Sequence, residues 1–216
     1  MVVDERRDII LLYIEDLACG YGETALFRGL KAELRPGDIA RVMGDNGTGK
    51  TTLLRTLAAL RLPLAGSIGW RRADRSWTTD PIERCAAQCF IGHDNALNGV
   101  LTPVENLEFL MRLAGRPANR RSIIEALRRR DLGRLLHRPC RALSAGQRRR
   151  VSLIRLWLTD APLWLLDEPA AALDASSRQT LASRINEHAA NGGITIFTTH
   201  ESLDIAHARP IELPAC

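Results

Sequence analysis

The chain has 216 residues, of which 45% are hydrophobic and 25% are charged, and its 30 basic and 25 acidic side chains give a net charge of +5. This composition excludes disordered and fibrous proteins and supplies enough apolar side chains for one substantial core. No run of sequence reaches the ~18 consecutive apolar residues that a membrane-spanning helix needs. We therefore expect one domain over residues 1–216 that does not cross a bilayer.

The N-terminal segment and the cysteines indicate the compartment. Charged residues at positions 4–8 precede a short apolar run at 9–14, whereas a secretory signal has a basic start, a longer apolar stretch and a small-residue cleavage site. The five cysteines are scattered and include no C-x-x-C pair, so neither a disulfide framework nor a zinc site is indicated. A cytosolic location is expected.

The first third of the chain predicts strands and one helix. Strands are expected over residues 11–17, 24–34, 39–43 and 67–71, with turns at 20–22 and 36–38. A helix is expected over residues 49–60, because its leucines recur at helical spacing. A strand, a glycine-rich loop and a helix thus follow one another directly.

The rest of the chain predicts a helical insert, about residues 93–158, followed by strands and helices in alternation. Helices are expected over residues 104–114, 121–130 and 145–158, and a helix over 179–190 lies between strands at 163–166 and 194–199. Buried parallel strands read as continuous apolar runs, as the strand at 163–166 does. We therefore expect an α/β fold with a parallel core sheet and helices on its faces.

The loop after the predicted strand at 39–43 fits the pattern G-x-x-x-x-G-K-[ST]. Its glycines allow backbone N–H groups to point at phosphate oxygens, while the N-terminus of the next helix faces the same anion. Lys50 is expected to reach the β and γ phosphates of a nucleotide, and the Thr51 hydroxyl to ligate Mg²⁺. The candidate nucleotide-binding residues here are Gly44, Asp45, Asn46, Gly47, Thr48, Gly49, Lys50, Thr51 and Thr52.

Two adjacent carboxylates, Asp167 and Glu168, end the apolar strand at 163–166. At the carboxyl end of a strand they would face the crevice where α/β folds bind ligands. Asp167 is placed to hold Mg²⁺, directly or through water, and Glu168 to polarise the water that attacks the γ-phosphate. A solvated, inert acidic pair is the alternative, but the combination with the phosphate loop favours nucleotide hydrolysis.

The sequence at 143–147, Leu-Ser-Ala-Gly-Gln, resembles the LSGGQ signature of the ABC-transporter ATPases. Residues 172–174 resemble the D-loop of that family, His200 its switch histidine, and Tyr21 the aromatic residue that stacks on adenine. The resemblance implies a P-loop NTPase fold of ABC ATPase type, with an N-terminal antiparallel β part and an inserted helical subdomain. It also implies that ATP and Mg²⁺ bind between two subunits paired head to tail, with Lys50 of one copy opposite Ser144 of the other. The residues implicated in this way are Tyr21, Ser144, Gly146, Gln147, Asp174 and, as a catalytic residue, His200.

The chain departs from the family pattern at two positions. His93 stands after a predicted strand where most relatives have a glutamine, and an imidazole there can still coordinate Mg²⁺ or hydrogen-bond a water. Ala145 replaces the first glycine of the signature, a small substitution that a helical backbone tolerates.

Residues 91–93, 101–107, 143–150 and 155–158 together resemble the CcmA family, the ATPase subunits of cytochrome c maturation ABC complexes. The resemblance implies a peripheral protein on the cytoplasmic face of a bacterial inner membrane, bound to the membrane subunit CcmB with CcmC and CcmD nearby. ATP hydrolysis is then linked to haem delivery, by release of the haem-loaded chaperone CcmE. The expected contact surface with CcmB lies between His93 and Leu110, although core packing explains Phe109 and Leu107 about as well. Its apolar contacts are Leu97, Val100, Leu101 and Phe109.

The sequence is compatible with two other functions: an ATPase subunit of a different ABC importer or exporter, and a soluble ABC ATPase that acts on nucleic acid or ribosomes. The arginine runs at 120–121, 128–130 and 148–150 invite the second of these. Only 5% of the residues are aromatic, however, and basic residues on helices are usually just solvated. We therefore assign no nucleic-acid partner.

Overall fold

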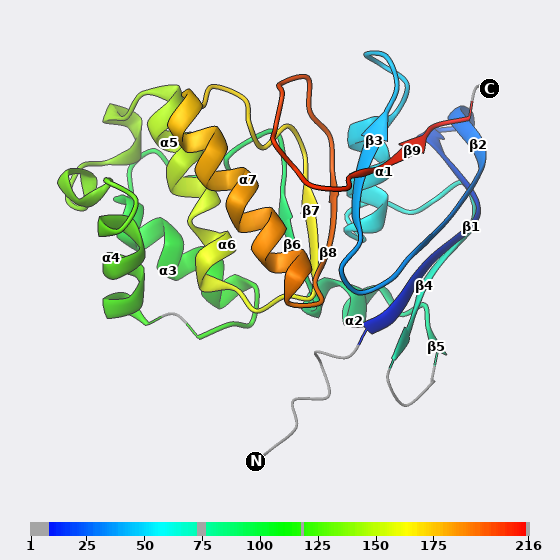
Figure 1. The fold of residues 1–216 in the computed structure, drawn as a ribbon, viewed down its shortest axis with the longest axis horizontal. Helices are drawn as coiled ribbons and strands as arrows, with labels where there is room; N and C mark the ends of the chain where they lie inside the picture. Colours follow the sequence, from blue (N-terminus) through cyan, green and yellow to red (C-terminus); the bar gives the residue numbers. More distant parts are fainter. Residues whose placement is uncertain (1–8, 73–76, 118, 215–216) are drawn as a thin grey trace.

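The computed structural model describes residues 9–72, 77–117 and 119–214, so that the charged segment at 4–8 and Cys216 lie outside the described residues. Figure 1 shows antiparallel strands at one end of the molecule, helices at the other, and parallel strands between them. In the described part of the chain, no helix combines the length and the apolarity that crossing a bilayer takes.

The N-terminal sheet is antiparallel, as expected, with the strand order β2-β1-β4-β5. Its strands are β1 (Ile9–Tyr21), β2 (Thr24–Leu34), β4 (Ala65–Arg72) and β5 (Trp77–Thr78). The prediction of a turn at 20–22 is wrong for Gly20 and Tyr21, which belong to β1 and pair with Ala25 and Thr24. A Cβ on Gly20 would lie 2.0 Å from the Thr24 carbonyl oxygen, so glycine is needed there for close strand pairing rather than for a turn.

The second sheet is parallel throughout its described pairs and has the strand order β6-β7-β8-β3-β9. Its strands are β6 (Gln88–Ile91), β7 (Leu163–Leu166), β8 (Ile194–Phe197), β3 (Ile39–Met43) and β9 (Arg209–Glu212). Every residue of β7 is buried, which confirms the inference from its continuous apolar run, and every residue of β8 is buried as well, Thr195 included. The edge strand β9 was not predicted, because only Ile211 in it is buried and its sequence carries no apolar run.

The helices are α1 (Lys50–Leu57), α2 (Pro81–Ala86), α3 (Pro103–Leu113), α4 (Arg120–Arg128), α5 (Ala145–Leu153), α6 (Arg155–Leu158) and α7 (Ala175–Ala190), with 3-10 turns η2 (Gly133–Leu135) and η3 (Cys140–Ala142). The single helix predicted over 145–158 is divided into α5 and α6, because the bonds around Ile154 span three residues instead of four. Helix α7 begins four residues before its predicted start, where Asp174 accepts a hydrogen bond from the Ser177 N–H and caps the helix.

Buried apolar side chains form three clusters. One lies between the antiparallel sheet, α1 and the parallel sheet, and a second lies between the parallel sheet, α6 and α7. The buried members of the third all lie between Val104 and Ile154, and Leu97 and Leu158 pack against them, so the helices of this segment pack around a core of their own. We call residues 103–158 the helical segment.

Candidate functional site

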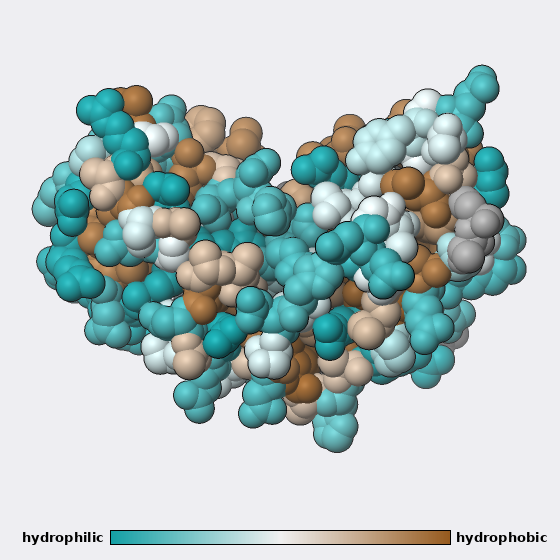
Figure 2. Space-filling view, turned by 90° about the horizontal axis from the view of Figure 1, so that it is seen from above, coloured by the Kyte–Doolittle hydropathy of each residue, from teal (hydrophilic) through white to brown (hydrophobic). Residues whose placement is uncertain are grey.

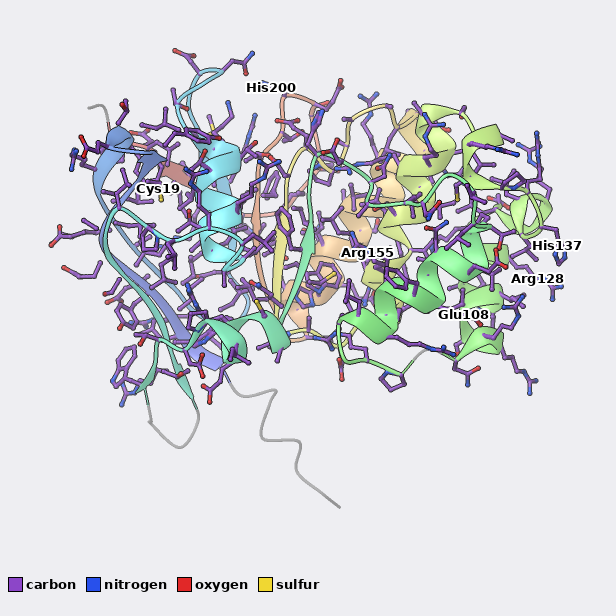
Figure 3. The ribbon with its side chains drawn as sticks, turned by 180° about the vertical axis from the view of Figure 1, so that it is seen from behind. Cys19, Glu108, Arg128, His137, Arg155 and His200 are labelled. Carbon is purple, nitrogen blue, oxygen red and sulfur yellow. The ribbon has the colours of Figure 1, made fainter. Side chains whose placement is uncertain are left out.

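Four neighbouring strands of the parallel sheet end at one edge of the molecule, and each is followed by a predicted site residue. The phosphate loop follows β3, Asp167 and Glu168 follow β7, His200 comes soon after β8, and His93 soon after β6. Figure 3 shows His200 at the same edge as the loop between β3 and α1, and Figure 2, seen from this edge, shows a hollow between the helical segment and the antiparallel sheet. The sheet topology thus brings together residues from four parts of the sequence.

The phosphate loop depends on its glycines. Gly44, Gly47 and Gly49 have φ angles of 141°, 86° and 107°, which other residues adopt only with strain. A Cβ on Gly44 would lie 2.7 Å from Thr48 Oγ1, and one on Gly49 would lie 3.1 Å from Phe27 Cδ1. Helix α1 begins directly after the loop, at Lys50, so that its positive end faces the concave side of the loop.

Lys50 bends back over this loop. Its Nζ donates hydrogen bonds to the carbonyl oxygens of Gly44, at 2.6 Å, and Asp45, at 3.0 Å. The described structure gives this ammonium no carboxylate partner, and its charge therefore remains for an anion. Tyr21, the last residue of β1 in the antiparallel sheet, is 54% exposed. Its hydroxyl accepts a 3.4 Å hydrogen bond from Thr52, and the Arg61 guanidinium lies 4.1 Å from the centroid of its ring.

Asp167 is almost completely buried, at 1% exposure, and its two carboxylate oxygens have different surroundings. Oδ1 accepts hydrogen bonds from the hydroxyls of Thr51, at 3.2 Å, and Thr198, at 2.8 Å. Oδ2 is buried and has no hydrogen-bond partner among the described residues. A buried carboxylate oxygen without a partner, beside a threonine hydroxyl, is a donor set that fits Mg²⁺, which prefers oxygen and completes its shell with phosphate and water.

Glu168 is held from two sides. Its N–H donates to Thr198 Oγ1 at 2.9 Å, its Oε2 accepts from the His200 N–H at 3.1 Å, and its Oε1 lies 3.6 Å from His200 Nε2. Its φ of 48° is in the left-handed region, which costs a residue with a Cβ about 1 kcal/mol or more. The structure thus brings Glu168 and His200 together, as a pair of catalytic residues requires.

His93 lies at the same edge but joins no partner there. Its side chain is exposed and makes no hydrogen bond or ion pair with Thr51 or Asp167 in the described structure. We also find no group of three or more His, Cys, Asp and Glu side chains arranged to hold a metal ion, within the described ranges. The role of His93 as a magnesium ligand therefore stays a prediction.

The signature residues form the exposed start of α5, away from the phosphate loop. Ser144 caps the helix: its Oγ accepts from the Gln147 N–H at 3.2 Å, and Gln147 Oε1 accepts from the Ser144 N–H at 3.0 Å. Ala145 is the first helical residue, so its substitution for glycine keeps the backbone helical. A Cβ on Gly146 would lie 2.7 Å from the Ala172 carbonyl oxygen, which places α5 in close contact with the segment before α7.

Asp174 ends that segment and caps α7. Its Oδ1 accepts hydrogen bonds from the Ser177 N–H, at 2.7 Å, and the Ser176 hydroxyl, at 3.0 Å. The side chain of Ser177, then its N–H and the Ser176 hydroxyl, stabilise the ionised carboxylate and lower its pKa from 3.8 to about 2. None of Ser144, Gly146, Gln147 and Asp174 is hydrogen-bonded to the phosphate loop within the described part of the chain.

Two site residues were missed in the sequence. Thr198 bridges Asp167 and Glu168, and its only signal is a polar residue at the end of an apolar strand, two positions before His200. Arg149 was interpreted as one of a run of solvated arginines, but it is 3% exposed and reaches the backbone at Asp167 and Glu168. No local pattern distinguishes it from its two arginine neighbours.

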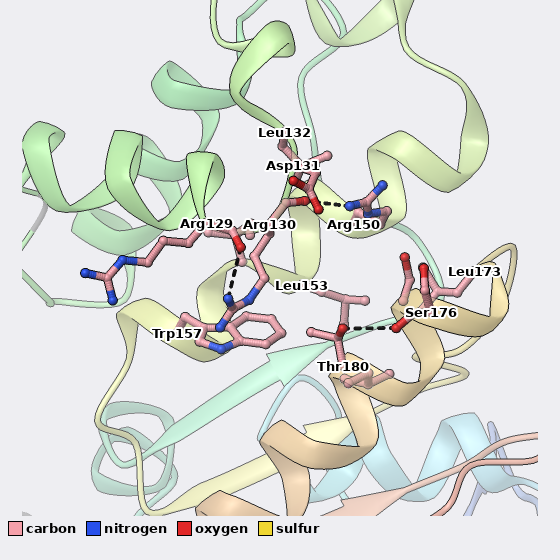
Figure 4. A pocket seen from close by; sticks show the side chains of 13 residues that line it. Arg129, Arg130, Asp131, Leu132, Arg150, Leu153, Trp157, Leu173, Ser176 and Thr180 are labelled. Atoms are coloured by element: carbon pink, nitrogen blue, oxygen red, sulfur yellow. Dashed lines mark hydrogen bonds between the residues drawn. The ribbon is translucent and has the colours of Figure 1, made fainter.

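A separate cavity of about 200 Å³ lies between α4, α5, α6 and α7 and contains none of the predicted site residues. Figure 4 shows Arg150 pointing into it and Arg130 stacked on Trp157. The Arg150 Nη2 donates to the Arg130 carbonyl oxygen at 2.5 Å, and the Arg130 guanidinium lies 4.4 Å from the Trp157 centroid.

A family model described as ABC transporter matches residues 27–171, which include the phosphate loop, the signature and the acidic pair. The chain belongs to the ABC transporter family. As an ABC transporter ATPase it binds and hydrolyses ATP, in agreement with the functional expectation from its motifs.

Within this family the chain is similar to proteins named cytochrome c biogenesis ATP-binding export protein CcmA. The one from Aromatoleum aromaticum is 44% identical over 204 residues, which cover 91% of each chain, and further CcmA proteins are 36% to 43% identical. An ABC transporter (ATP-binding protein) from Pyrococcus furiosus has a TM-score of 0.77 and 26% identity, over 94% of this chain and 97% of that one. A dimeric bacterial ABC transporter cassette has the same fold, with a TM-score of 0.74 and 23% identity over 88% of both chains.

Proposed function

We propose that the chain is the ATP-hydrolysing subunit of an ABC complex for c-type cytochrome biogenesis. This complex is of the ABC-type haem transporter class. In it, ATP hydrolysis drives haem delivery and the release of haem-loaded CcmE through the membrane subunit CcmB. The observation that carries the proposal is the similarity to CcmA proteins over 91% of the chain at 44% identity.

The geometry supports a defined role for each residue at the strand ends. Lys50, now held by the Gly44 and Asp45 carbonyls, would turn to the β and γ phosphates. Thr51 and Asp167 would hold Mg²⁺, which when bound neutralises charge on the phosphate oxygens. Glu168 would orient the attacking water and accept its proton, and His200, in contact with Glu168, would face the γ-phosphate.

The signature would act on a nucleotide held by a second copy of the chain. Its residues begin α5 at an exposed end and make no hydrogen bond with the phosphate loop of their own chain in the described structure. A helix N-terminus attracts anions, because its first N–H groups and the helix dipole face outward. Two chains paired head to tail would thus complete two nucleotide sites.

The membrane subunit would dock on the helical segment and so keep the protein at the cytoplasmic face of the inner membrane. Phe109 and Leu113, one turn apart on α3, are 58% and 73% exposed, and Val100, in the loop before α3, is 71% exposed. Leu107 is fully buried and belongs to the core. The exposed three offer apolar contacts of the kind that interfaces use, with CcmC and CcmD nearby in the complex.

Complementation tests this function. In a bacterium whose ccmA gene is deleted, we expect the chain to restore haem-stained c-type cytochromes and to co-purify with a small polytopic membrane protein. The variant Glu168→Gln should not restore them. If the chain folds and hydrolyses ATP but leaves the cells without c-type cytochromes, it serves a different ABC transporter.

The assignment of Glu168 has its own test in the purified protein. Glu168→Gln should retain ATP binding while turnover falls by about 10² or more, because the general base is lost. Glu201→Gln is the matched control, since Glu201 is an exposed carboxylate next to His200 that pairs with Arg178. Equal turnover in Glu168→Gln and wild type would move the catalytic role to another group.

A further inference from the structure

Arg149 makes five hydrogen bonds from the middle of α5. Its Nε donates to the Pro169 carbonyl oxygen at 3.3 Å, and its Nη2 donates to the carbonyl oxygens of Asp167, at 2.8 Å, and Glu168, at 2.7 Å. Its Nη1 donates to the Gly92 carbonyl oxygen at 2.8 Å and to Asn95 Oδ1 at 3.2 Å. A guanidinium has five N–H donors, so every donor of this side chain is used.

These acceptors belong to two segments that the functional site needs. Three of them are the consecutive backbone carbonyls of residues 167–169, directly after β7, and this segment includes the proposed catalytic carboxylate of Glu168. Gly92 immediately precedes His93, and Asn95 lies in the same loop after β6. Arg149 itself lies five residues after Ser144, on the helix whose first turn would meet the partner's nucleotide. One side chain therefore joins the signature helix, the β7 end and the His93 loop.

This position is not that of a surface arginine. Arg149 is 3% exposed, and in the described structure it has no ion pair with a carboxylate. Burial of a charge without a carboxylate partner is costly unless its hydrogen bonds are complete, and here they are. The next arginine on α5, Arg150, points instead into the cavity beside Arg130 and makes one backbone contact there.

The contact also bears on the strained backbone at Glu168. The Glu168 carbonyl oxygen accepts from Arg149, while the N–H of the same residue donates to Thr198. Both peptide groups of a residue with a φ of 48° are thus fixed from outside. A side chain that fixes this backbone also fixes the direction in which the carboxylate leaves it.

We infer that Arg149 is a positioning residue for ATP hydrolysis: it holds Glu168 in its left-handed conformation and couples the signature helix and the His93 loop to that carboxylate. The inference rests on the proposed ATPase function. Arg149 acts through Glu168 and contacts no substrate.

A double-mutant cycle tests the inference on the full-length protein. Arg149→Gln should lower kcat by about 10-fold or more. The Kd for ATP should change by less than about 3-fold, because the substitution alters neither the phosphate loop nor Lys50. In the Glu168→Gln background, the same Arg149→Gln change should lower the remaining turnover by less than about 2-fold. Arg149→Lys keeps the charge but offers three donors in place of five, so it should recover part of the lost kcat.

The control is Arg184→Gln on α7. Arg184 also donates through Nε and Nη2 to a backbone carbonyl, that of Leu156. In the described structure it makes no hydrogen bond to Asp167, to Glu168 or to the loop that carries His93. It should leave kcat within about 2-fold of wild type. If Arg149→Gln does not fold, Arg149→Lys carries the same cycle.

The possible results distinguish a failure of the proposed ATPase function from a failure of the positioning role of Arg149. Absence of ATP hydrolysis in the wild-type chain would overturn the proposed function and the inference with it. Hydrolysis in the wild type with an unchanged kcat in the Arg149 variants would overturn the inference alone. Equal losses from Arg149→Gln with and without Glu168 would also overturn it, because the arginine would then not act through that carboxylate.

Discussion

Single side chains at this site are defined by what surrounds them rather than by their type. Asp167 and Glu168 are neighbours in sequence, yet Asp167 is buried beneath two threonine hydroxyls while Glu168 turns toward His200. The backbone differs as well, because Glu168 has a positive φ of 48° and Asp167 does not. One carboxylate is thereby suited to a cation and the other to a water.

The surroundings of His188 likewise set its protonation, mainly through burial. Its ring stacks on Trp164, with a centroid distance of 3.7 Å and an interplanar angle of 2°. Burial, and next the charge of Arg184, lower its pKa from 6.5 to about 4. The folded state therefore favours the neutral ring, while the unfolded chain takes up a proton as the pH falls below its pKa.

This predicts a pH-dependent stability. The contribution of the neutral His188 ring to the free energy of unfolding is complete above about pH 6.5 and is lost as the pH falls toward about 4. Near pH 5, the free energy of unfolding of the wild type should therefore be about 2 kcal/mol lower on account of this group. Urea unfolding near pH 7.5 and near pH 5 should show a smaller loss in His188→Gln than in wild type. The exposed His137→Gln serves as the control and should behave as wild type does. Equal losses in all three proteins would contradict the prediction.

At the scale of elements, contacts between α5 and its neighbours decide what the sequence tolerates. Gly146, the second residue of α5, packs against the Ala172 carbonyl oxygen, whereas Ala145 before it is exposed. Helix propensity alone would favour alanine over glycine by up to about 1 kcal/mol. The contact with the Ala172 oxygen favours glycine instead, since a backbone oxygen cannot move away from an added Cβ as a flexible side chain can.

We therefore expect Gly146→Ala to destabilise the protein by about 1–3 kcal/mol, because its Cβ would lie 2.7 Å from that oxygen. Ala145→Gly is the matched change in the reverse direction and should cost at most about 1 kcal/mol. Thermal or urea unfolding of both variants measures this. A Gly146→Ala protein as stable as wild type would show that α5 and the segment before α7 separate freely.

At the scale of the whole molecule, the phosphate loop and the signature lie on different parts of one chain. The loop follows β3 in the parallel sheet, and the signature opens α5 in the helical segment. In the proposed head-to-tail pair, each loop would face the other chain's signature, and a two-fold axis would make this contact occur twice. Nucleotide would then connect the two chains, and hydrolysis would separate them.

Mixing two inactive variants tests this pairing. Lys50→Ala and Ser144→Arg should each be inactive alone, because both sites of either homodimer lack one half. A mixed dimer has one intact site, built from Lys50 of one chain and Ser144 of the other, so an equal mixture should recover up to about a quarter of wild-type turnover. No recovery in the mixture, with each variant folded, would contradict the head-to-tail arrangement.

Strands and motifs whose defining residues are adjacent in the chain could be predicted from the sequence. The strand at Leu163–Leu166 has the expected bounds, because full burial imposes an unbroken apolar run. The strand at Ile39–Met43 also has the expected bounds, although its Arg41 is half-buried and its Met43 is exposed. The edge strand β9 and the break before α6 were not predictable in this way. Their formation depends on hydrogen bonds to neighbouring elements or on local bonding changes that leave no periodic signal.

What the sequence by itself determined is therefore local: a phosphate loop, an acidic pair at a strand end, a capped signature helix, and the family to which they belong. Only the tertiary structure decided that Arg149, in a run of three arginines, is buried, and that Thr198 joins Asp167 to Glu168. The physical reason is that hydrogen-bond satisfaction makes a buried charge stable, and the Arg149 acceptors come from segments 18 to 57 residues away. A side chain's neighbours in sequence cannot specify partners that the fold alone brings to it.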